Sequence, residues 1–446
     1  MKKKIIYLLI LSFAIVSCSK IFDVNPTDSI SSEIAIKDKA GIEHALSGTY
    51  NALQSIGLYG RNYVIVSDLA ADNLIWTGTS QDYGQITNKP IPAENSIIDA
   101  FWSASYDGIN RANNILYKLP EITDVTAEES ARYEGEALFI RGLLYFNLVS
   151  HFGGVPLKTL PTLDLSSINC ARNSKEEIYA QIITDLNAAK AKLSTSKTAG
   201  KANSFSASAL LARVYMSKYF DLSDAASAGL AVNETTRLID EGGFTLDPSF
   251  GGLFSSATAS TESIFEVVYD LQNYNRLAQY FYTRNLIGRY EVAPTPDFIQ
   301  SFETEDIRLA STVAYDEANL PYGIKYNDVS GGTDRVYVLR LAEMYLLRAE
   351  ALAYTGGDIS SIQADIDQVR SRAGLASTTA TSLDELKLAI ENERRHEFAF
   401  EGHRWSDLVR TKRATVLFGI DPDYTLFPIP LSEMQTNNKM EQNHGY

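Results

Sequence analysis

Near its C-terminus the chain concentrates charge and large aromatic side chains in one short stretch, residues 392–410. It reads Asn-Glu-Arg-Arg-His-Glu-Phe-Ala-Phe-Glu-Gly-His-Arg-Trp-Ser-Asp-Leu-Val-Arg. A solvated run of charges has no need of aromatic residues, yet Phe398, Trp405 and Leu408 fall on a single stripe of a helix. The stretch therefore predicts helix packed by its aromatic side onto the rest of the protein.

Two charged residues, Arg394 and Glu401, share that stripe. A buried charge must find a partner to offset the loss of its hydration. Helical side chains three residues apart can meet, and this spacing predicts three ion pairs: Arg394–Glu397, Glu401–Arg404 and Arg404–Asp407. Because glycine destabilises a helix interior by about 1 kcal/mol relative to alanine, we predict two helical segments hinged near Gly402 and locked by a partly buried ion network.

Helix-period patterns also cover most of the remaining sequence. Helices are predicted at residues 37–56, 99–119, 128–152, 206–220, 223–240, 340–355, 360–372 and 383–410. Another helix begins at Ser174, which forms a capping box with Glu177. Between about 243 and 335 glycine, serine, threonine and proline increase, and we expect loops and short strands there, including residues 263–269.

Three helical segments share an apolar-x-apolar-Arg pattern that ends at Arg141, Arg213 and Arg348. The arginines are 72 and 135 residues apart, close to two and four periods of about 34 residues. A smaller residue follows each arginine and suits a close helix crossing, as in tetratricopeptide-like packing. The predicted fold class is therefore mostly α, with tetratricopeptide-like helical pairs as a scaffold and a loop-rich insertion containing short strands.

The N-terminus has the character of a targeting segment. A charged start is followed by about a dozen apolar residues, a run too short to span a bilayer. The residues that end in Ser17-Cys18 resemble a bacterial lipobox, which implies a signal peptide over residues 1–17, fatty acylation of Cys18 and a lipidated tether over residues 18–35. An ordinary secretory peptide with an incidental cysteine is the alternative. The second cysteine, Cys170, is then single, so no structural disulfide is expected.

The formal net charge of −15 argues against nucleic acid or anionic lipid headgroups as partners recognised by bulk charge. It favours neutral or cationic ligands, although only weakly.

Two stretches combine aromatic rings with amide or charged side chains, the pairing that sugar rings and their hydroxyls require. The first contains Asn73, Trp76 and Tyr83, and Trp76 opens a polar loop with a glycine. The second contains Tyr280 and Tyr282 beside asparagines and arginines. We predict that these five residues contribute to a ligand surface, with Trp76 and Tyr83 as a glycan platform. The alternative for each ring is a place in the core.

No catalytic or metal motif is complete. His396 and His403 are seven residues apart, which separates them by about 10 Å along a helix axis, too far to share one zinc ion. Ser194 and Lys197 match Ser-x-x-Lys without the motifs that would complete an acyl-transfer site. Calcium is compatible with the acidity, but no oxygen-ligand loop is present. We therefore predict no catalytic residue, metal or cofactor.

The quoted stretch resembles the C-terminal signature of the RagB/SusD family, outer-membrane nutrient-uptake lipoproteins. Further stretches that resemble the family lie at residues 67–73, 135–146, 152–157 and 340–351. The resemblance covers nearly the whole mature chain and implies one SusD-like domain over residues 36–446. Its parts would be a helical half (36–242), a loop-rich insertion (243–335) and a C-terminal helical part (336–446).

For function, the resemblance implies a protein on the cell surface that captures oligosaccharides, or in some members peptides. Such a protein would deliver them to a SusC-type TonB-dependent transporter of the outer membrane. The resemblance does not imply catalysis. We interpret the signature residues as a structural clamp and not a binding site: Arg394, Glu397, Glu401, Arg404 and Trp405. The alternative from a different functional class, an enzyme and not a binding protein, is a lipid-anchored hydrolase.

Overall fold

The computed structural model describes residues 35–163, 169–255 and 260–446. The predicted signal peptide, Cys18 and all but the last residue of the predicted tether lie outside the described residues. Within the described ranges, no helix combines the length and the apolar character needed to cross a membrane.

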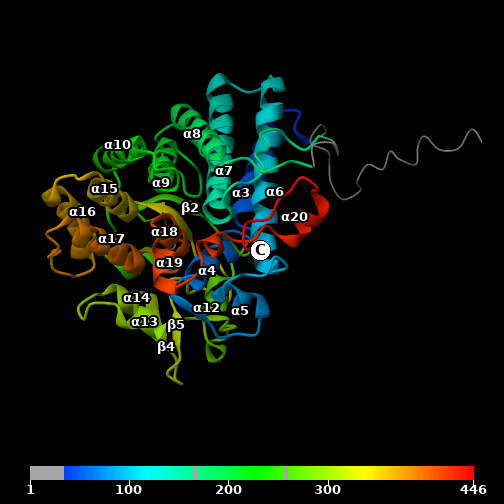
Figure 1. Ribbon diagram of the computed structural model, residues 1–446. Coiled ribbons are helices and arrows are strands. Elements are labelled where there is room, and N and C mark those ends of the chain that lie inside the picture. Colours follow the sequence, from blue (N-terminus) through cyan, green and yellow to red (C-terminus); the bar gives the residue numbers. More distant parts are fainter. Residues whose placement is uncertain (1–34, 164–168, 256–259) are drawn as a thin grey trace, which may run out of the picture.

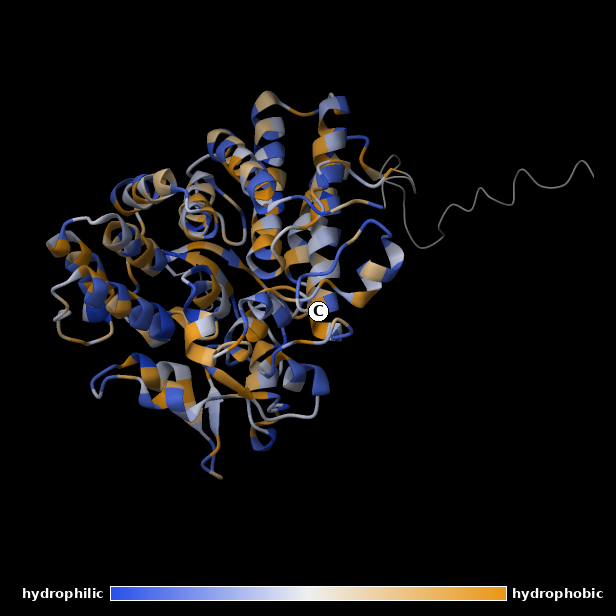
Figure 2. Cartoon of the chain, viewed as in Figure 1, coloured by the Kyte–Doolittle hydropathy of each residue, from blue (hydrophilic) through white to orange (hydrophobic). Residues whose placement is uncertain are grey.

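A curved stack of helices forms the scaffold, running in Figure 1 from the blue and cyan helices to the orange ones. Its members are α3 (Lys39–Leu53), α6 (Ser96–Lys118), α7 (Ala127–Phe152), α8 (Lys175–Lys192), α9 (Ser204–Leu222), α10 (Ala225–Glu241), α15 (Leu341–Thr355), α16 (Ile359–Arg372) and α17 (Leu383–Glu397). Successive members pack side by side, and α15 packs on α10 although about a hundred residues separate them. Figure 2 shows hydrophobic and hydrophilic residues along the same helices, as expected for helices with one buried face.

The three arginines of the repeated pattern tie neighbouring helices together. Each binds both oxygens of one carboxylate, at 2.6–2.8 Å. The pairs are Arg141–Asp185 between α7 and α8, Arg213–Glu343 between α9 and α15, and Arg348–Asp365 between α15 and α16. Such bidentate bonds fix geometry as well as adding energy. The predicted mostly helical, tetratricopeptide-like fold is confirmed, and so is the capping box of Ser174 and Glu177.

Short elements fill the insertion between α10 and α15. They are α11 (Phe250–Ser255), α12 (Leu277–Phe281), η3 (Arg284–Leu286), α13 (Pro296–Gln300) and α14 (Arg308–Thr312), with strands β2 (Ser263–Val267), β3 (Val292–Pro294), β4 (Val313–Tyr315), β5 (Pro321–Gly323) and β6 (Val336–Arg340). All strand pairs are antiparallel: β2 with β6, β4 with β5, and β3 with β1 (Leu74–Trp76) of the N-terminal half. The last pair joins the insertion to the scaffold.

The remaining elements are α4 (Asn62–Leu69), α5 (Gln81–Thr87), η1 (Leu119–Glu121), α18 (Arg404–Arg410), α19 (Arg413–Phe418), η4 (Pro422–Thr425) and α20 (Leu431–Thr436). Of these, α4 and α5 contact β1, and those after α17 close the chain. Figure 1 places α18 and α19 near the centre of the molecule, beside α4.

The predicted hinge in the signature is confirmed. Helix α17 ends at Glu397, and the chain passes through Phe400 (φ 65°) and Gly402 (φ 86°) before α18 begins at Arg404. A side chain at Gly402 would be strained at this φ, and its Cβ would lie 2.9 Å from the Tyr63 ring. The three residues of the aromatic stripe are fully buried, as predicted: Phe398, Trp405 and Leu408.

The predicted ion network exists, but the predicted pairings are wrong. Glu397 binds Arg308, Arg340 and Arg372 instead of Arg394. Arg394 and Glu397 do share α17, but tertiary packing surrounds Glu397 with guanidinium groups from α14, β6 and α16. Glu401 and Arg404 lie on opposite sides of the break at Gly402 and so no longer share one helical face. Burial acts to raise the pKa of Glu397, but the three guanidinium groups outweigh it and hold that pKa well below its usual range.

The other signature charges also pair differently from the prediction, within the signature or with distant residues. Glu401 binds Lys325 and Arg340, Arg394 binds Asp407, and Arg404 binds Asp72. Arg340 therefore lies at the centre of a buried ion cluster that comprises Glu262, Arg308, Lys325, Arg340, Arg372, Glu397 and Glu401. Members come from the insertion, from α16 and from the signature, so the cluster joins three parts of the chain.

A buried carboxyl group outside this cluster, that of Asp68, lies near the end of α4. Asp68 accepts hydrogen bonds at Oδ1 from Asn73 Nδ2 (2.7 Å) and from the Phe400 N–H (3.2 Å). Its Oδ2 is buried and has no partner among the described residues. Burial outweighs these bonds and raises the pKa of Asp68 to about 7.

Loss of the central arginine should destabilise the protein strongly. Replacing Arg340 by methionine leaves three carboxylates buried without their shared partner, and we expect a loss of about 3–5 kcal/mol in the free energy of unfolding. Urea denaturation measures it. The matched control is Arg111→Met, which removes an exposed pair with Asp107 and should cost less than about 1 kcal/mol. Equal losses in both variants would contradict the role given to the cluster.

Asp68 should make stability fall as the pH rises. Its pKa is about 7 in the folded state, against 3.8 as the ordinary value, so unfolding releases a proton between these limits. The stability contribution is complete below pH 4 and lost as the pH passes 7. In Asp68→Asn this dependence disappears, so stability relative to the unmodified protein should increase by up to about 4 kcal/mol from pH 4 to pH 8. Urea midpoints across that range test it, and parallel curves would count against it.

Candidate ligand-binding surface

Trp76 is the last residue of β1 and remains partly exposed. Its ring lies against Gly84 of α5, where an added Cβ would approach ring carbon Cε3 to 2.8 Å. Its Nε1 has no hydrogen-bond partner among the described residues. Trp76 is therefore not a fully buried core residue. Its ring packs against Gly84, but the residue is still partly exposed to solvent.

Tyr83 and Asn73 lie beneath this surface. Tyr83 is 1% exposed and donates its hydroxyl to Asn62 Oδ1 at 3.1 Å. Asn73 is fully buried and bridges Asp68 and Arg395. The predicted platform of Trp76 and Tyr83 is thus not formed by two exposed rings, because the fold uses the second ring and the amide as internal supports.

Tyr280 of α12 packs edge to face on Tyr83, with ring centroids 5.9 Å apart. It is 7% exposed, and two guanidinium groups lie over its ring: Arg61 at 4.4 Å and Arg289 at 5.1 Å from the centroid. Arg61 also donates to the Tyr280 hydroxyl. The structure therefore brings the two sequence-predicted stretches together at this ring.

Tyr282 follows α12 and is half-buried. Its ring packs on Tyr322 of β5, with centroids 4.8 Å apart. Burial, aided by Tyr322 and Asp334, raises the pKa of Tyr282 to about 12, so its hydroxyl is neutral at physiological pH and can donate a hydrogen bond.

The polar loop after Trp76 is held by one buried carboxylate. Glu291 is 1% exposed, and its oxygens accept hydrogen bonds from the backbone N–H groups of Thr79 (2.9 Å) and Ser80 (3.0 Å) and from the Thr79 hydroxyl. At Gly78 an added Cβ would lie 2.0 Å from Glu291 Oε2. This glutamate thus fixes the loop that borders Trp76.

Sequence reasoning did not identify Glu291, Arg61, Arg289 or Tyr322. Nothing in the sequence marks Glu291, because an acid in a loop-rich segment is common and its partners lie more than two hundred residues away. Arg61 and Arg289 have no pattern that sets them apart from the other polar residues near the aromatic stretches.

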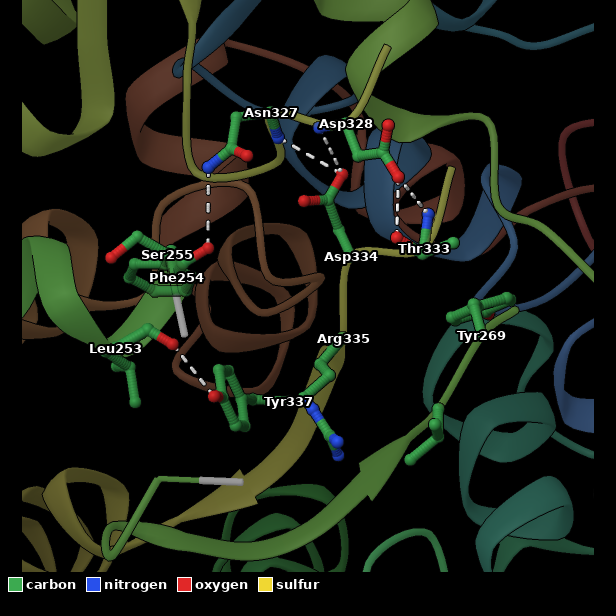
Figure 3. Close-up of a pocket in the computed structure, with 11 residues that line it drawn as sticks. Leu253, Phe254, Ser255, Tyr269, Asn327, Asp328, Thr333, Asp334, Arg335 and Tyr337 are labelled. Carbon is green, nitrogen blue, oxygen red and sulfur yellow. Dashed lines mark hydrogen bonds between the residues drawn. The ribbon is translucent and has the colours of Figure 1, made fainter. Parts of the chain in front are cut away.

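A cavity of about 520 Å³ adjoins this surface and is drawn in Figure 3. Its lining includes Tyr269, Asn327, Asp334 and Tyr337. Asn275 connects the two regions by donating its side-chain N–H to the Asp334 carbonyl oxygen at 2.8 Å. The volume suits a small ligand, but the Asp334 carboxylate is already engaged by two backbone N–H groups of its own loop.

The two histidines considered for zinc face different partners. His396 Nε2 lies 2.9 Å from Ser301 Oγ, while the His403 ring stacks on Phe398 with centroids 4.8 Å apart. In the described part of the chain, no group of three or more His, Cys, Asp or Glu side chains is placed to hold a metal ion.

Comparison with known families agrees with the architecture. Residues 322–421 match the SusD family, and residues 22–216 match a family described as starch-binding associating with outer membrane. SusD-like protein P2 of Formosa agariphila is 26% identical over the full length of both chains. The starch-binding protein SusD of Bacteroides thetaiotaomicron is 34% identical over 24% of this chain and 21% of its own.

Solved structures share the fold over nearly the whole chain. A SusD superfamily protein from Bacteroides vulgatus has a TM-score of 0.82 at 22% identity, covering 92% of this chain and 99% of its own. A laminarin binding SusD-like protein has a TM-score of 0.81 at 26% identity, covering 92% of this chain and 100% of its own. The two family matches, the full-length relatives and the shared helical scaffold agree with one another: this chain is a SusD-like protein.

Proposed function

We propose that this protein binds glycan fragments, without catalysis, at the surface around Trp76, Tyr280 and Tyr282. The observation that supports the proposal is the association of two partly exposed aromatic residues, Trp76 and Tyr282, with the buried Tyr280 and with hydrogen-bonding groups on a fixed loop. Sugar rings present C–H faces that pack on aromatic rings, while their hydroxyls need polar partners. The similar starch-binding protein SusD and the laminarin binding SusD-like protein support the same ligand class.

We further propose that the protein is lipid-anchored through Cys18 on the outer surface of the outer membrane. There it would deliver its ligand to a SusC-type TonB-dependent transporter. The lipobox-like sequence and the description of the family matched by residues 22–216 support this location. Stable anchoring requires more than one acyl chain, in keeping with a lipobox cysteine that carries several.

Native affinity electrophoresis tests glycan capture. The protein migrates through gels that contain plant, host or microbial polysaccharides, and retardation in one or a few gels identifies the class of ligand. Absence of retardation in every gel would count against polysaccharides. Calorimetry against peptide digests and short oligosaccharides would then distinguish the peptide alternative, and product formation on incubation with a bound ligand would revive the hydrolase hypothesis.

Trp76→Ala should weaken binding to the retained polysaccharide roughly tenfold or more, because a stacking face is lost. Trp76→Phe should restore part of the affinity. The matched control is Tyr117→Ala, which removes an exposed aromatic ring from α6 and should leave affinity unchanged. Unchanged affinity in Trp76→Ala, with circular dichroism identical to that of the parent, would exclude Trp76 from the site.

Gly78→Ala should reduce binding by displacing the loop, since the new Cβ would collide with Glu291. Gly229→Ala is the matched control because Gly229 lies in α10 with no atom within 4 Å of an added Cβ. That change should leave affinity intact and stabilise the helix by up to about 1 kcal/mol. Titration of both variants against the retained polysaccharide measures the difference. Equal affinities would show that the fixed loop is dispensable.

A further inference from the structure

We propose that the ligand of this surface is an anionic glycan, one that carries carboxylate or sulfate groups. This inference rests on the proposed glycan-binding function and names the class of sugar. It is carried by the ion pairing of the arginines.

Nearly every arginine in the described residues has a carboxylate partner within salt-bridge distance. Those without one are Arg61, Arg172, Arg276 and Arg284. Arg172 is bonded instead to backbone carbonyls and to Asn443. The other three belong to the aromatic surface or to the turn that follows α12. The chain is acidic overall and pairs most of its arginines with carboxylates. At the aromatic surface and the turn after α12, by contrast, these three guanidinium groups have no carboxylate partner among the described residues.

The guanidinium groups of this surface are held in place by neutral partners. Arg276 donates to Gln279 Oε1 (3.0 Å) and to the Tyr274 hydroxyl (2.9 Å), and its group lies 4.8 Å from the centroid of that ring. Arg61 donates to Asn62 Oδ1 at 2.8 Å and to the Tyr280 hydroxyl. A guanidinium has five N–H donors, so both retain donors for a ligand.

A further guanidinium over the Tyr280 ring, that of Arg289, does have a carboxylate within salt-bridge distance, but the contact is long. Its Nη2 lies 3.6 Å from Glu291 Oε1, whereas Glu291 already accepts three hydrogen bonds from the loop after Trp76. Arg289 is 50% exposed. The Arg289 N–H donates to the Gln279 carbonyl oxygen, and the Arg276 N–H to the Gly60 carbonyl oxygen beside Arg61, so the backbone keeps the three arginines together.

This arrangement has a specific chemical use. Planar guanidinium groups bind carboxylates and sulfate-type oxyanions through parallel hydrogen bonds, while adjacent rings can pack on the sugar. The net charge of −15 opposes general attraction of polyanions, so an anionic ligand would be bound only where local positive charge exceeds that background. The net charge of the chain weakly favours a neutral or cationic ligand, whereas the local arginines favour an anionic one at this site.

Isothermal titration of the full-length protein in detergent against three polysaccharides tests the proposal. Polygalacturonate carries only carboxylates, a sulfated galactan only sulfate esters, and laminarin no charge. We expect at least one of the anionic polymers to bind more tightly than laminarin, and its affinity to fall with added salt as charge screening grows. Which polymer binds identifies the anionic group.

Substitutions of the arginines test whether this surface binds the anionic polymer. Arg276→Gln and Arg289→Gln should each weaken anionic binding about tenfold, the loss expected for a charge-assisted hydrogen bond. Arg276→Lys should retain the salt dependence but not the full affinity, because lysine lacks the planar fork. Arg111→Gln removes a half-exposed arginine of α6 and should change nothing.

The outcomes separate this inference from the function on which it rests. Binding of laminarin without preference for either polyanion, or polyanion binding unaffected by the substitutions at Arg276 and Arg289, would overturn the anionic class and leave glycan capture standing. Absence of binding to all three, with no retardation in any polysaccharide gel, would overturn both.

Discussion

The buried ion cluster around Arg340 is the interaction on which the rest of the structure depends. A guanidinium that is 1% exposed is stable there only because three carboxylates surround it. Two of these come from the signature, and the third, Glu262, immediately precedes β2. Folding of the signature and of the insertion is therefore coupled, since neither can bury its charges without the other.

The same signature holds the base of the proposed ligand surface. Its Arg404 binds Asp72 through both carboxylate oxygens, and Arg395 binds Asn73. These acceptors directly precede β1, whose last residue is Trp76. The antiparallel pairing of Trp76 with Val292 then brings the insertion and its arginines to the same place. A clamp far from Trp76 in sequence thus determines where that ring lies.

The surface differs from a deep pocket in what it can recognise. Arg61 and Arg289 lie over the Tyr280 ring. The partly exposed residues Trp76 and Tyr282 are therefore the ones that remain for contact with a ligand. Rigid support matters for such a site because binding then costs less ordering of the protein. The Glu291 carboxylate illustrates the point: it is buried, and it fixes the loop beside Trp76.

The sequence by itself determined the helical scaffold, the hinge at Gly402 and the burial of Trp405, because periodicity, capping and glycine act over a few residues. It also pointed to Trp76 and to the tyrosines near residue 280 as candidate ligand residues, in two separate stretches. The ion partners could not be derived, since Glu397 and Arg308 are close only after the chain has folded. Tertiary structure alone decided that Tyr83 and Asn73 are supports and that Glu291 holds the loop. It also decided that Arg61, Arg276 and Arg284 have no carboxylate partner in the described part of the chain. Burial and long-range charge pairing are properties of packing, which local sequence spacing does not encode.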